Sequence, residues 1–408
     1  MGYDQKFARE ETLIFFIRST EEPDVPLVPM YDFDRMPVRA GSDSIKWHAV
    51  SGDVIPMWVA DLDMETPREI VDAVIARASH PYYGYPYTQD ALKTHIIAHY
   101  RKTYGVAIDP EWIVWVPSVI PGVVTALEMM NGSFMYSVPM YDHIRRLDAE
   151  AGLPVIEVPL KRDENCRYSM DVEALEAALT PEVKCLILCN PHNPIGRVYT
   201  REELEEIQAF ASRHNLLVIC DEIHCELDLE GRHIPYFSLN EAAAQYSVTV
   251  SSAGKICNIP GLPMGFAIIP NAELRHRFFK QQDGLQTSGN IMTLVAYEKA
   301  YNGSCALWKE ELREYLRGNR DLAEARFKQF PELKLPHNEG TYLLWIDCSE
   351  LGLDDPAEFF LDKAHVKVCS GEIFGYQQCI RFNYGCPRGQ LIQVLDRMEK
   401  ALLELRAK

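Results

Sequence analysis

The stretch that decides the fold is "VKCLILCNPHNPIGRVYTREELEEIQAFASRHNLLVICDEI", residues 183–223. It contains two continuous apolar runs, 183–190 and 215–222, separated by a turn and by the helix-periodic segment 201–214. Thr200 stands directly before that segment and Glu203 follows three places later, which is the pattern of a capping box. Because continuous apolar runs are typical of strands buried on both faces, the stretch predicts a strand–helix–strand unit of a parallel sheet.

The same alternation continues on both sides of this stretch. Further strands are expected at 111–117, 132–139, 152–160, 246–252 and 265–270, and a further helix at 171–179. Strands that alternate with helices indicate an α/β domain with three layers and a mostly parallel sheet. We expect this large domain to cover residues 75–310.

The pattern changes after residue 305. A long charged helix is expected over 305–329, followed by strands at 341–349, 365–371 and 379–385 and a closing amphipathic helix at 389–408. This clustering predicts a smaller α+β domain over 311–408, to which the segment 30–74 contributes. Residues 1–29 are expected to form an N-terminal extension.

The amino-acid composition excludes several classes of binding partner. The 408 residues carry a formal net charge of −18, which argues against nucleic acid and anionic membranes because phosphate groups are bound by excess lysine and arginine. A small-molecule substrate fits better. The eleven cysteines are an odd number, which favours reduced thiols and a cytoplasmic location. Because the sequence contains no CxxC pair, we expect no metal site. The apolar runs are shorter than the ~18 residues of a membrane span.

Polar residues follow several buried strands, where open parallel sheets place their ligands. Asn193 lies in "CNPHNPIG" (189–196), a rigid turn that either aims a side chain at a ligand or is a plain turn. Asp221 ends a buried strand, where a carboxylate is costly unless it meets a cation, although it could also cap a helix. His224 follows three places later, so both side chains could face one cavity.

Two cationic residues complete the candidate site. Lys255 lies in "SSAGKIC" (251–257), where its small neighbours leave room for a bulky partner; the alternative is a surface lysine. Arg381 lies inside the apolar strand "CIRFNYG" (379–385), where it could bind a carboxylate or form an internal salt bridge.

The order and spacing of Asn193, Asp221, Lys255 and Arg381 resemble the class I/II aminotransferase family of fold-type I pyridoxal 5′-phosphate (PLP) enzymes. The resemblance covers nearly the whole chain from about Met30. Within that family, several stretches look like the cystathionine β-lyase (carbon–sulfur lyase) branch: "IPMWVADLDMETP" (55–67), "YYGYPY" (82–87), "GKICNIPGL" (254–262), "GTYLLWID" (340–347) and "IRFNYGCPR" (380–388).

The resemblance implies roles for these residues. Lys255 would bind PLP covalently and would later remove the substrate Cα proton. Asp221, with His224 beside it, would keep the ring nitrogen protonated, and Asn193 would donate to the 3′-oxygen of the ring. Tyr141 would stack on the ring.

The phosphate and the substrate would be held by further residues. The amides of Val119 and Ile120, at the start of a helix, and the hydroxyl of Ser252 would bind the phosphate. Tyr85, as a catalytic and cofactor-binding residue, would reach the phosphate from the neighbouring subunit, which implies a homodimer with shared active sites. Arg381 would bind the substrate α-carboxylate.

Two positions depart from the wider family. Gly254 stands where many relatives carry serine, and Pro263 stands where aminotransferases usually carry an arginine that binds phosphate. The lyase branch shares the second absence. The resemblance therefore implies β-elimination of L-cystathionine or related cysteine S-conjugates to a thiol, pyruvate and ammonia. An aminotransferase and a non-catalytic PLP-binding regulatory protein are the alternatives.

Overall fold

The stretch 183–223 folds into a strand, a helix and a second parallel strand in the computed structural model, which describes residues 30–35, 38–87, 90–285 and 289–407. These elements are β7 (Val183–Cys189), α8 (Arg201–Arg213) and β8 (Leu217–Asp221). The capping box is confirmed: Thr200 Oγ1 accepts the Glu203 amide at 3.3 Å, and Glu203 Oε2 accepts the Thr200 amide at 2.7 Å. The expected extension 1–29 lies outside the described residues.

The large sheet has seven strands and is mostly parallel, as predicted. Its order is β2-β10-β9-β8-β7-β3-β4, and β10 alone runs antiparallel to both of its neighbours. The strands not yet introduced are β2 (Ile113–Val116), β3 (Ser133–Val138), β4 (Val155–Pro159), β9 (Ser247–Ser251) and β10 (Gly265–Ile268).

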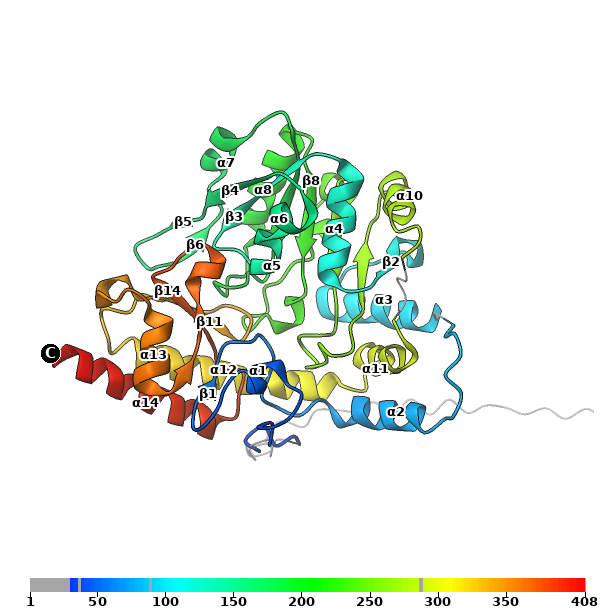
Figure 1. Ribbon diagram of the computed structural model, residues 1–408. Helices are drawn as coiled ribbons and strands as arrows, with labels where there is room; N and C mark the ends of the chain where they lie inside the picture. Colours follow the sequence, from blue (N-terminus) through cyan, green and yellow to red (C-terminus); the bar gives the residue numbers. More distant parts are fainter. Residues whose placement is uncertain (1–29, 36–37, 88–89, 286–288, 408) are drawn as a thin grey trace, which may run out of the picture. The chain divides into compact units, whose positions relative to one another are not determined.

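Helices cover both faces of this sheet (Figure 1). Along β7, Cys185 and Ile187 belong to one apolar core, while Leu186 and Leu188 belong to the other. One face is covered by α4 (Val119–Met130), α5 (Asp142–Arg145) and α10 (Ala272–Gln281), and the other by α7 (Val172–Ala178), α8 and α9 (Glu241–Gln245). The three-layer prediction is confirmed, because the residues of the central strands β8 and β9 are buried on both faces of the sheet.

The C-terminal part has its own antiparallel sheet, in the order β11-β14-β13. Its elements are β11 (Leu343–Asp347), α13 (Pro356–Ala364), β12 (Val366–Lys367), β13 (Cys369–Ser370), β14 (Cys379–Asn383) and α14 (Arg388–Arg406). The N-terminal strand β1 (Ile55–Pro56) pairs with β12. Since α12 (Ala306–Phe327) runs without a break through the expected boundary at 310/311, the domain division stays a prediction.

The remaining elements connect these layers. They are α1 (Ile45–His48), α2 (Arg68–Ala78), α3 (Asp90–Tyr104), α6 (Leu147–Ala151), α11 (Ile291–Tyr301), the hairpin β5 (Lys161–Arg162) and β6 (Tyr168–Ser169), and the 3-10 turns η1 (Pro110–Trp112), η2 (Cys225–Leu227), η3 (Tyr236–Ser238), η4 (Ser349–Leu351) and η5 (Gly371–Phe374).

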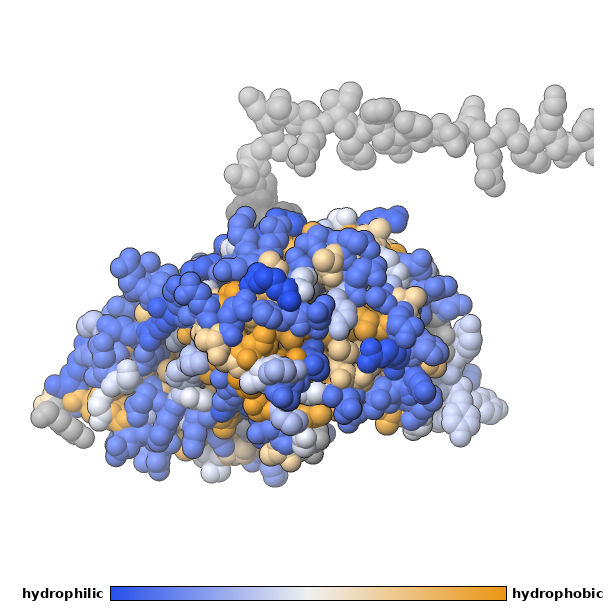
Figure 2. All heavy atoms as spheres, turned by 90° about the horizontal axis from the view of Figure 1, so that it is seen from above, coloured by the Kyte–Doolittle hydropathy of each residue, from blue (hydrophilic) through white to orange (hydrophobic). Residues whose placement is uncertain are grey.

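All eleven cysteines are free thiols; ten are buried and Cys166 is half-buried. Among the described residues, no helix is long and apolar enough to cross a membrane, and none of their His, Cys, Asp and Glu side chains form a group able to hold a metal ion. Figure 2 shows that hydrophilic residues cover most of one face and that hydrophobic residues gather toward its middle.

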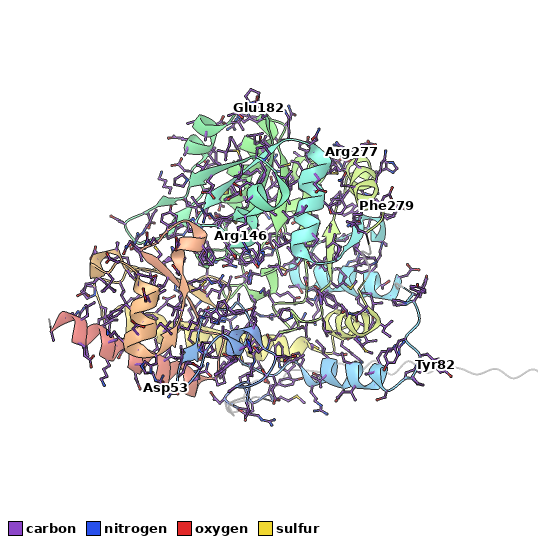
Figure 3. The ribbon with its side chains drawn as sticks, viewed as in Figure 1. Asp53, Tyr82, Arg146, Glu182, Arg277 and Phe279 are labelled. Carbon is purple, nitrogen blue, oxygen red and sulfur yellow. The ribbon has the colours of Figure 1, made fainter. Side chains whose placement is uncertain are left out.

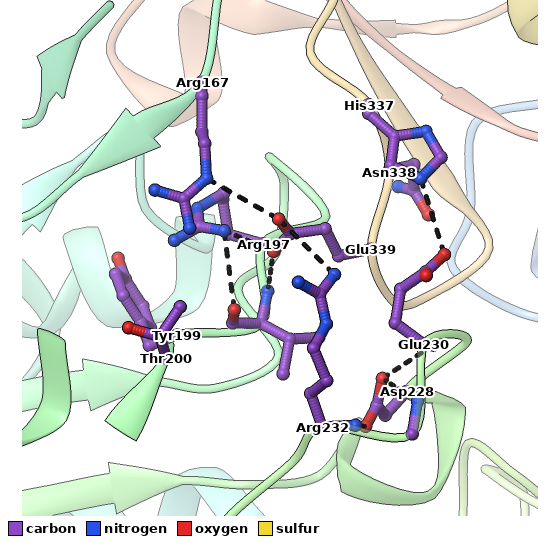
Figure 4. A network of polar contacts seen from close by, with 12 residues as sticks. Arg167, Arg197, Tyr199, Thr200, Asp228, Glu230, Arg232, His337, Asn338 and Glu339 are labelled. Atoms are coloured by element: carbon purple, nitrogen blue, oxygen red, sulfur yellow. Dashed lines mark hydrogen bonds and ion pairs between the residues drawn. The ribbon is translucent and has the colours of Figure 1, made fainter. Parts of the chain in front are cut away.

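A buried ion network fixes the loop after β7 (Figure 4). Arg197, fully buried, pairs with Glu339 and with Glu203, the second pair at 2.6 Å. Glu339 also accepts the Val198 amide at 2.9 Å, and its own amide donates to Gly196 O at 2.8 Å. The turn that carries Asn193 is therefore tied to the loop that leads into β11.

Candidate active site

One cavity brings together eight of the ten predicted site residues. They are Val119, Ile120, Tyr141, Asn193, Asp221, His224, Ser252 and Lys255. The sheet explains this convergence: β7, β8 and β9 are parallel, so the segments that leave their carboxyl ends meet at one edge. Asn193 and Lys255 both line this cavity, so Asn193 does not lie in a plain turn and Lys255 is not a surface lysine.

Lys255 lies in the turn after β9, with its amine inside the cavity. Its Nζ donates to the carbonyl oxygen of Ala60 at 2.6 Å. Burial and, to a lesser degree, the charge of nearby Arg381 lower the pKa of this amine to about 8, although Asp61 and Asp221 act in the opposite direction. A large share of the amine is therefore neutral just above neutral pH, which a nucleophile or base requires.

Asp221 is buried at the end of β8. One carboxylate oxygen, Oδ1, accepts the Ile223 amide at 3.1 Å, a local turn-capping bond, while the side chain still lines the cavity. Burial raises the pKa of Asp221 to about 6. Such a carboxyl would bind a cationic partner in the cavity strongly, because that partner would offset the cost of burial.

His224 also faces this cavity and is 1% exposed. Burial, with the charges of Lys255 and Arg381, lowers its pKa well below the ordinary range, so the ring is neutral. Its Nδ1 has no hydrogen-bond partner among the described residues. The imidazole therefore has an unused polar atom, and it lines the same cavity as Asp221.

Arg381 lies next to the cavity and holds Asn193. Its Nη1 donates to Asn193 Oδ1 at 3.0 Å and its Nη2 to the carbonyl oxygen of Trp58 at 2.8 Å, and its guanidinium lies 4.8 Å from the centre of the Phe374 ring. No salt bridge of Arg381 is found within the described part of the chain, so the internal-pair alternative does not apply. Its buried Nε has no partner there either.

The start of α4 also lines the cavity. Val119 and Ile120 supply its first amides, which have no acceptor within the helix, and the side chain of the N-cap residue Ser118 makes no capping bond. Ser252 Oγ lies nearby, within 2.8 Å of Met264 O and 2.6 Å of the Tyr297 hydroxyl. Neutral donors thus gather here; of the described cavity residues, Lys255 alone has a cationic side chain.

Tyr141 and Tyr85 differ in their surroundings. Tyr141 lines the cavity, and burial raises the pKa of its phenol. Tyr85 lies apart from the cavity in this chain, on the connection between α2 and α3, and is fully exposed. Tyr82, which Figure 3 places beyond the end of α2, is 74% exposed as well. The structure of one chain therefore does not bring Tyr85 to the site.

Several contacts at the site were not predicted from the sequence. They involve the main-chain oxygens of Trp58 and Ala60 and the side chains of Asn258, Tyr297 and Tyr342. The motifs "IPMWVADLDMETP", "GKICNIPGL" and "GTYLLWID" marked the right segments. They did not reveal that carbonyl groups would make the contacts, because a main-chain oxygen has no residue-type signature.

The proteins to which this chain is similar in sequence and fold agree with the geometry of this cavity. A family model described as aminotransferase class I and II matches residues 53–398. The cystathionine β-lyase PatB of Bacillus subtilis (strain 168) is 33% identical over 394 residues, which are 91% of this chain and 100% of the relative. A crystal structure of OvoB matches with a TM-score of 0.87 and 38% identity, covering 91% of this chain and 99% of that chain. Cystalysin from Treponema denticola, whose crystal structure contains a pyridoxal 5′-phosphate cofactor, matches with a TM-score of 0.87 and 28% identity, covering 92% and 100%.

Proposed function

The chain belongs to the aminotransferase class I and II family, and from that premise we propose that it is a PLP-dependent carbon–sulfur β-lyase. Its substrate would be L-cystathionine or a related cysteine S-conjugate, and its products a thiol, pyruvate and ammonia. The observation that carries this proposal is the single cavity in which Lys255, Asp221 and the first amides of α4 face one another.

The residues present fit PLP. The buried carboxyl of Asp221, with its pKa of about 6, suits a protonated ring nitrogen, and His224, whose Nδ1 has no partner among the described residues, lines the same cavity. Since Asn193 Oδ1 already accepts from Arg381, the Asn193 amide nitrogen is left to donate to the ring oxygen. The phosphate would take the amides of Val119 and Ile120.

In this proposal the chain positions the cofactor and moves one proton. When bound, PLP supplies an electron sink for the electron pair left at the substrate Cα. Lys255 takes the Cα proton onto Nζ, which its lowered pKa of about 8 prepares it to do. Tyr141 and Asp221 line the cavity; Tyr141 would stack on the ring, and Asp221 would keep its nitrogen protonated.

The substrate is oriented by Arg381, whose unpaired Nε is free to donate to the α-carboxylate. After the Cα proton leaves, the Cβ–S bond breaks with its electron pair on sulfur, and the thiolate is protonated and released. The remaining enamine hydrolyses in water to pyruvate and ammonia. Atoms and electrons balance without an added oxidant or amino acceptor.

Pro263 favours elimination over amino transfer. It lines the cavity at the position where aminotransferases carry a phosphate-binding arginine, so the phosphate would be held by neutral donors instead. The similarity to a cystathionine β-lyase over 91% of the chain supports the same choice. An aminotransferase would use the same Lys255 and Asp221, so an activity assay has to distinguish the lyase from the aminotransferase.

The deciding experiment supplies purified protein with PLP and L-cystathionine and measures pyruvate and free thiol, with and without an added 2-oxo acid. We expect both products without the oxo acid. Turnover that requires the oxo acid would replace the lyase by an aminotransferase. Lys255→Ala should lose the product and the visible absorption of lysine-bound PLP, whereas Lys400→Ala, exposed on α14, should behave as wild type.

We also propose a homodimer and a cytoplasmic location. Tyr82, Tyr83, Tyr85 and Tyr87 are exposed in one chain, with Tyr85 and Met292 on one surface pocket, and a second copy would cover such an aromatic surface. Eleven free thiols suit a reducing compartment.

A further inference from the structure

Asn258, in the motif "GKICNIPGL", ties the turn of Lys255 to a distant segment. Its side-chain Oδ1 accepts the Leu62 amide at 3.1 Å, and its Nδ2 donates to the carbonyl oxygens of Leu62 at 3.0 Å and Met64 at 2.8 Å. Its own carbonyl oxygen accepts the Thr66 hydroxyl at 3.0 Å. The same residue donates its amide to Lys255 O at 3.3 Å, so it belongs to the lysine's turn.

The segment held by Asn258 supplies the acceptor for the lysine amine. Ala60 O receives Lys255 Nζ at 2.6 Å and the Tyr342 hydroxyl at 3.0 Å. A carbonyl oxygen has two lone pairs, and both are used here. Next along the chain, Asp61 pairs with Arg39 at 2.9 Å. On the two sides of Ala60, Asn383 Nδ2 donates to Val59 O at 2.5 Å and to Asp61 O at 2.8 Å, so Asn383 holds this segment together with Asn258.

We propose that Asn258 is a positioning residue that holds the Ala60 carbonyl against the Lys255 amine and thereby sets the direction of the amine's lone pair. A neutral amine has two N–H bonds and one lone pair. With one N–H committed to Ala60, rotation about the last side-chain bond is restricted, and the lone pair can face the cavity. This inference rests on the proposed function, in which that lone pair takes the Cα proton.

The backbone of Asn258 allows a clean test. Its φ of +52° is left-handed, a conformation that glycine adopts without strain. Asn258→Gly therefore removes the three side-chain bonds and keeps the turn. Asn215 has nearly the same φ, +51°, on an exposed position between α8 and β8, so Asn215→Gly is the matched control.

The first measurement uses protein without cofactor. Reductive methylation of Lys255, followed by mass spectrometry over a range of pH, reports the pKa of its amine, which Arg381, His224, Asp61 and Asp221 surround. In Asn258→Gly we expect the midpoint to rise above the wild-type value of about 8, because water reaches the loosened amine. Hydrogen exchange at the Leu62 amide should accelerate as well. Asn215→Gly should match wild type in both.

The second measurement separates positioning from mere structure. In the lyase assay kcat should fall about tenfold in Asn258→Gly, while KM changes less than about twofold because Arg381 keeps its own contacts. If the glycine variant does not fold, Thr66→Val, which removes only the bond from the Thr66 hydroxyl to the Asn258 carbonyl oxygen, should show a smaller shift in the same direction.

A variant with the wild-type methylation profile and wild-type exchange would overturn the inference. Both readouts are taken without substrate, so they stand even if the protein proves to be an aminotransferase. Conversely, absent lyase activity with an intact wild-type methylation midpoint and the expected shift in Asn258→Gly would refute the proposed function alone.

Discussion

At the scale of single residues, the site contains a group that costs stability in the absence of its partner. Asp221 is buried, and its pKa is raised to about 6 from an ordinary value near 4. Between these values the folded chain holds a proton that the unfolded chain has lost, so the free energy of unfolding falls as pH rises. A shift of about two pKa units corresponds to roughly 3 kcal/mol.

Asp221→Asn should therefore stabilise the cofactor-free protein and weaken cofactor binding. The gain in unfolding free energy should be small at pH 4, grow through pH 6 and reach at most about 3 kcal/mol at pH 8, because only the charged carboxylate is penalised. Denaturant unfolding at these pH values, with a PLP titration, measures both effects. Asp362→Asn, at an exposed position of α13, is the control; an equal gain there, or none at Asp221, would contradict the argument.

The sequence could indicate the residues whose chemistry depends on their side chains. Lys255, Asp221, Asn193 and Arg381 stood out because a polar group inside a buried strand or directly after one is costly without a partner. Ala60 and Trp58 could not stand out, since their contacts use main-chain oxygens, and Asn258 was indicated only as part of the motif "GKICNIPGL". The predicted roles of the site residues stay predictions until the variants are measured.

At the scale of elements, the position of α4 depends on Gly122. A Cβ at this position would lie 3.0 Å from Val250 Cγ1 and 3.2 Å from Val116 Cγ1. Both valines are fully buried in strands and cannot move aside easily. The close approach of α4 to β9 and β2 thus sets where its first amides enter the cavity.

Gly122→Ala should weaken PLP binding about tenfold, equivalent to about 1.4 kcal/mol, by moving the first turn of α4 away from the sheet. Stability should change less, because the helix gains about 1 kcal/mol in propensity against an overpacking cost of about 1–3 kcal/mol. Equilibrium dialysis with PLP and thermal unfolding measure the two. Gly389→Ala, in α14 with open space around it, should retain full affinity; equal affinity in both variants would count against this account.

The elements themselves were largely predictable. Each expected strand of the large sheet is present within a few residues, because its apolar run had to be buried on both faces. The antiparallel direction of β10 was not predictable, since strand direction depends on the connection after the Lys255 turn and leaves no periodic signal. The β1–β12 pair is two residues long and joins distant segments, so local sequence patterns do not predict it either.

At the scale of the whole molecule, the Glu339 network joins segments that are far apart in the chain. Arg197 and Glu339 are separated by 142 positions, and both are buried. A buried pair contributes little compared with an apolar alternative, but removing one partner leaves an uncompensated charge. The network therefore makes the turn of Asn193 and the loop before β11 fold together.

Glu339→Gln should lower the free energy of unfolding by about 3 kcal/mol, because Arg197 loses the more deeply buried of its two carboxylate partners. Urea unfolding of the complete chain measures the loss. Asp72→Asn breaks the exposed pair with Arg68 and should cost less than about 1 kcal/mol. Similar losses in the two variants would show that the buried network contributes no more to the free energy of unfolding than an exposed ion pair does.

The proposed dimer makes a prediction about shared sites. In a mixture of Lys255→Ala and Tyr85→Ala chains, hybrid dimers would contain one intact site only if Tyr85 acts on the partner's cavity. Activity should then recover to about a quarter of wild type, since half of randomly mixed dimers are hybrids with one working site of two. No recovery over the separate variants would place Tyr85 in its own chain's site or outside catalysis.

The burial of the cysteine thiols affects how long the enzyme stays active in the presence of the thiol that it releases. Free thiols released into an oxidising medium become disulfides, and disulfides exchange with any exposed protein thiolate. Burial raises the pKa of Cys225 and Cys379 to about 12, so these sulfurs stay protonated and unreactive. Cys166, half-buried and 2.9 Å from Arg162 Nη2, is where self-inactivation by mixed disulfides would begin.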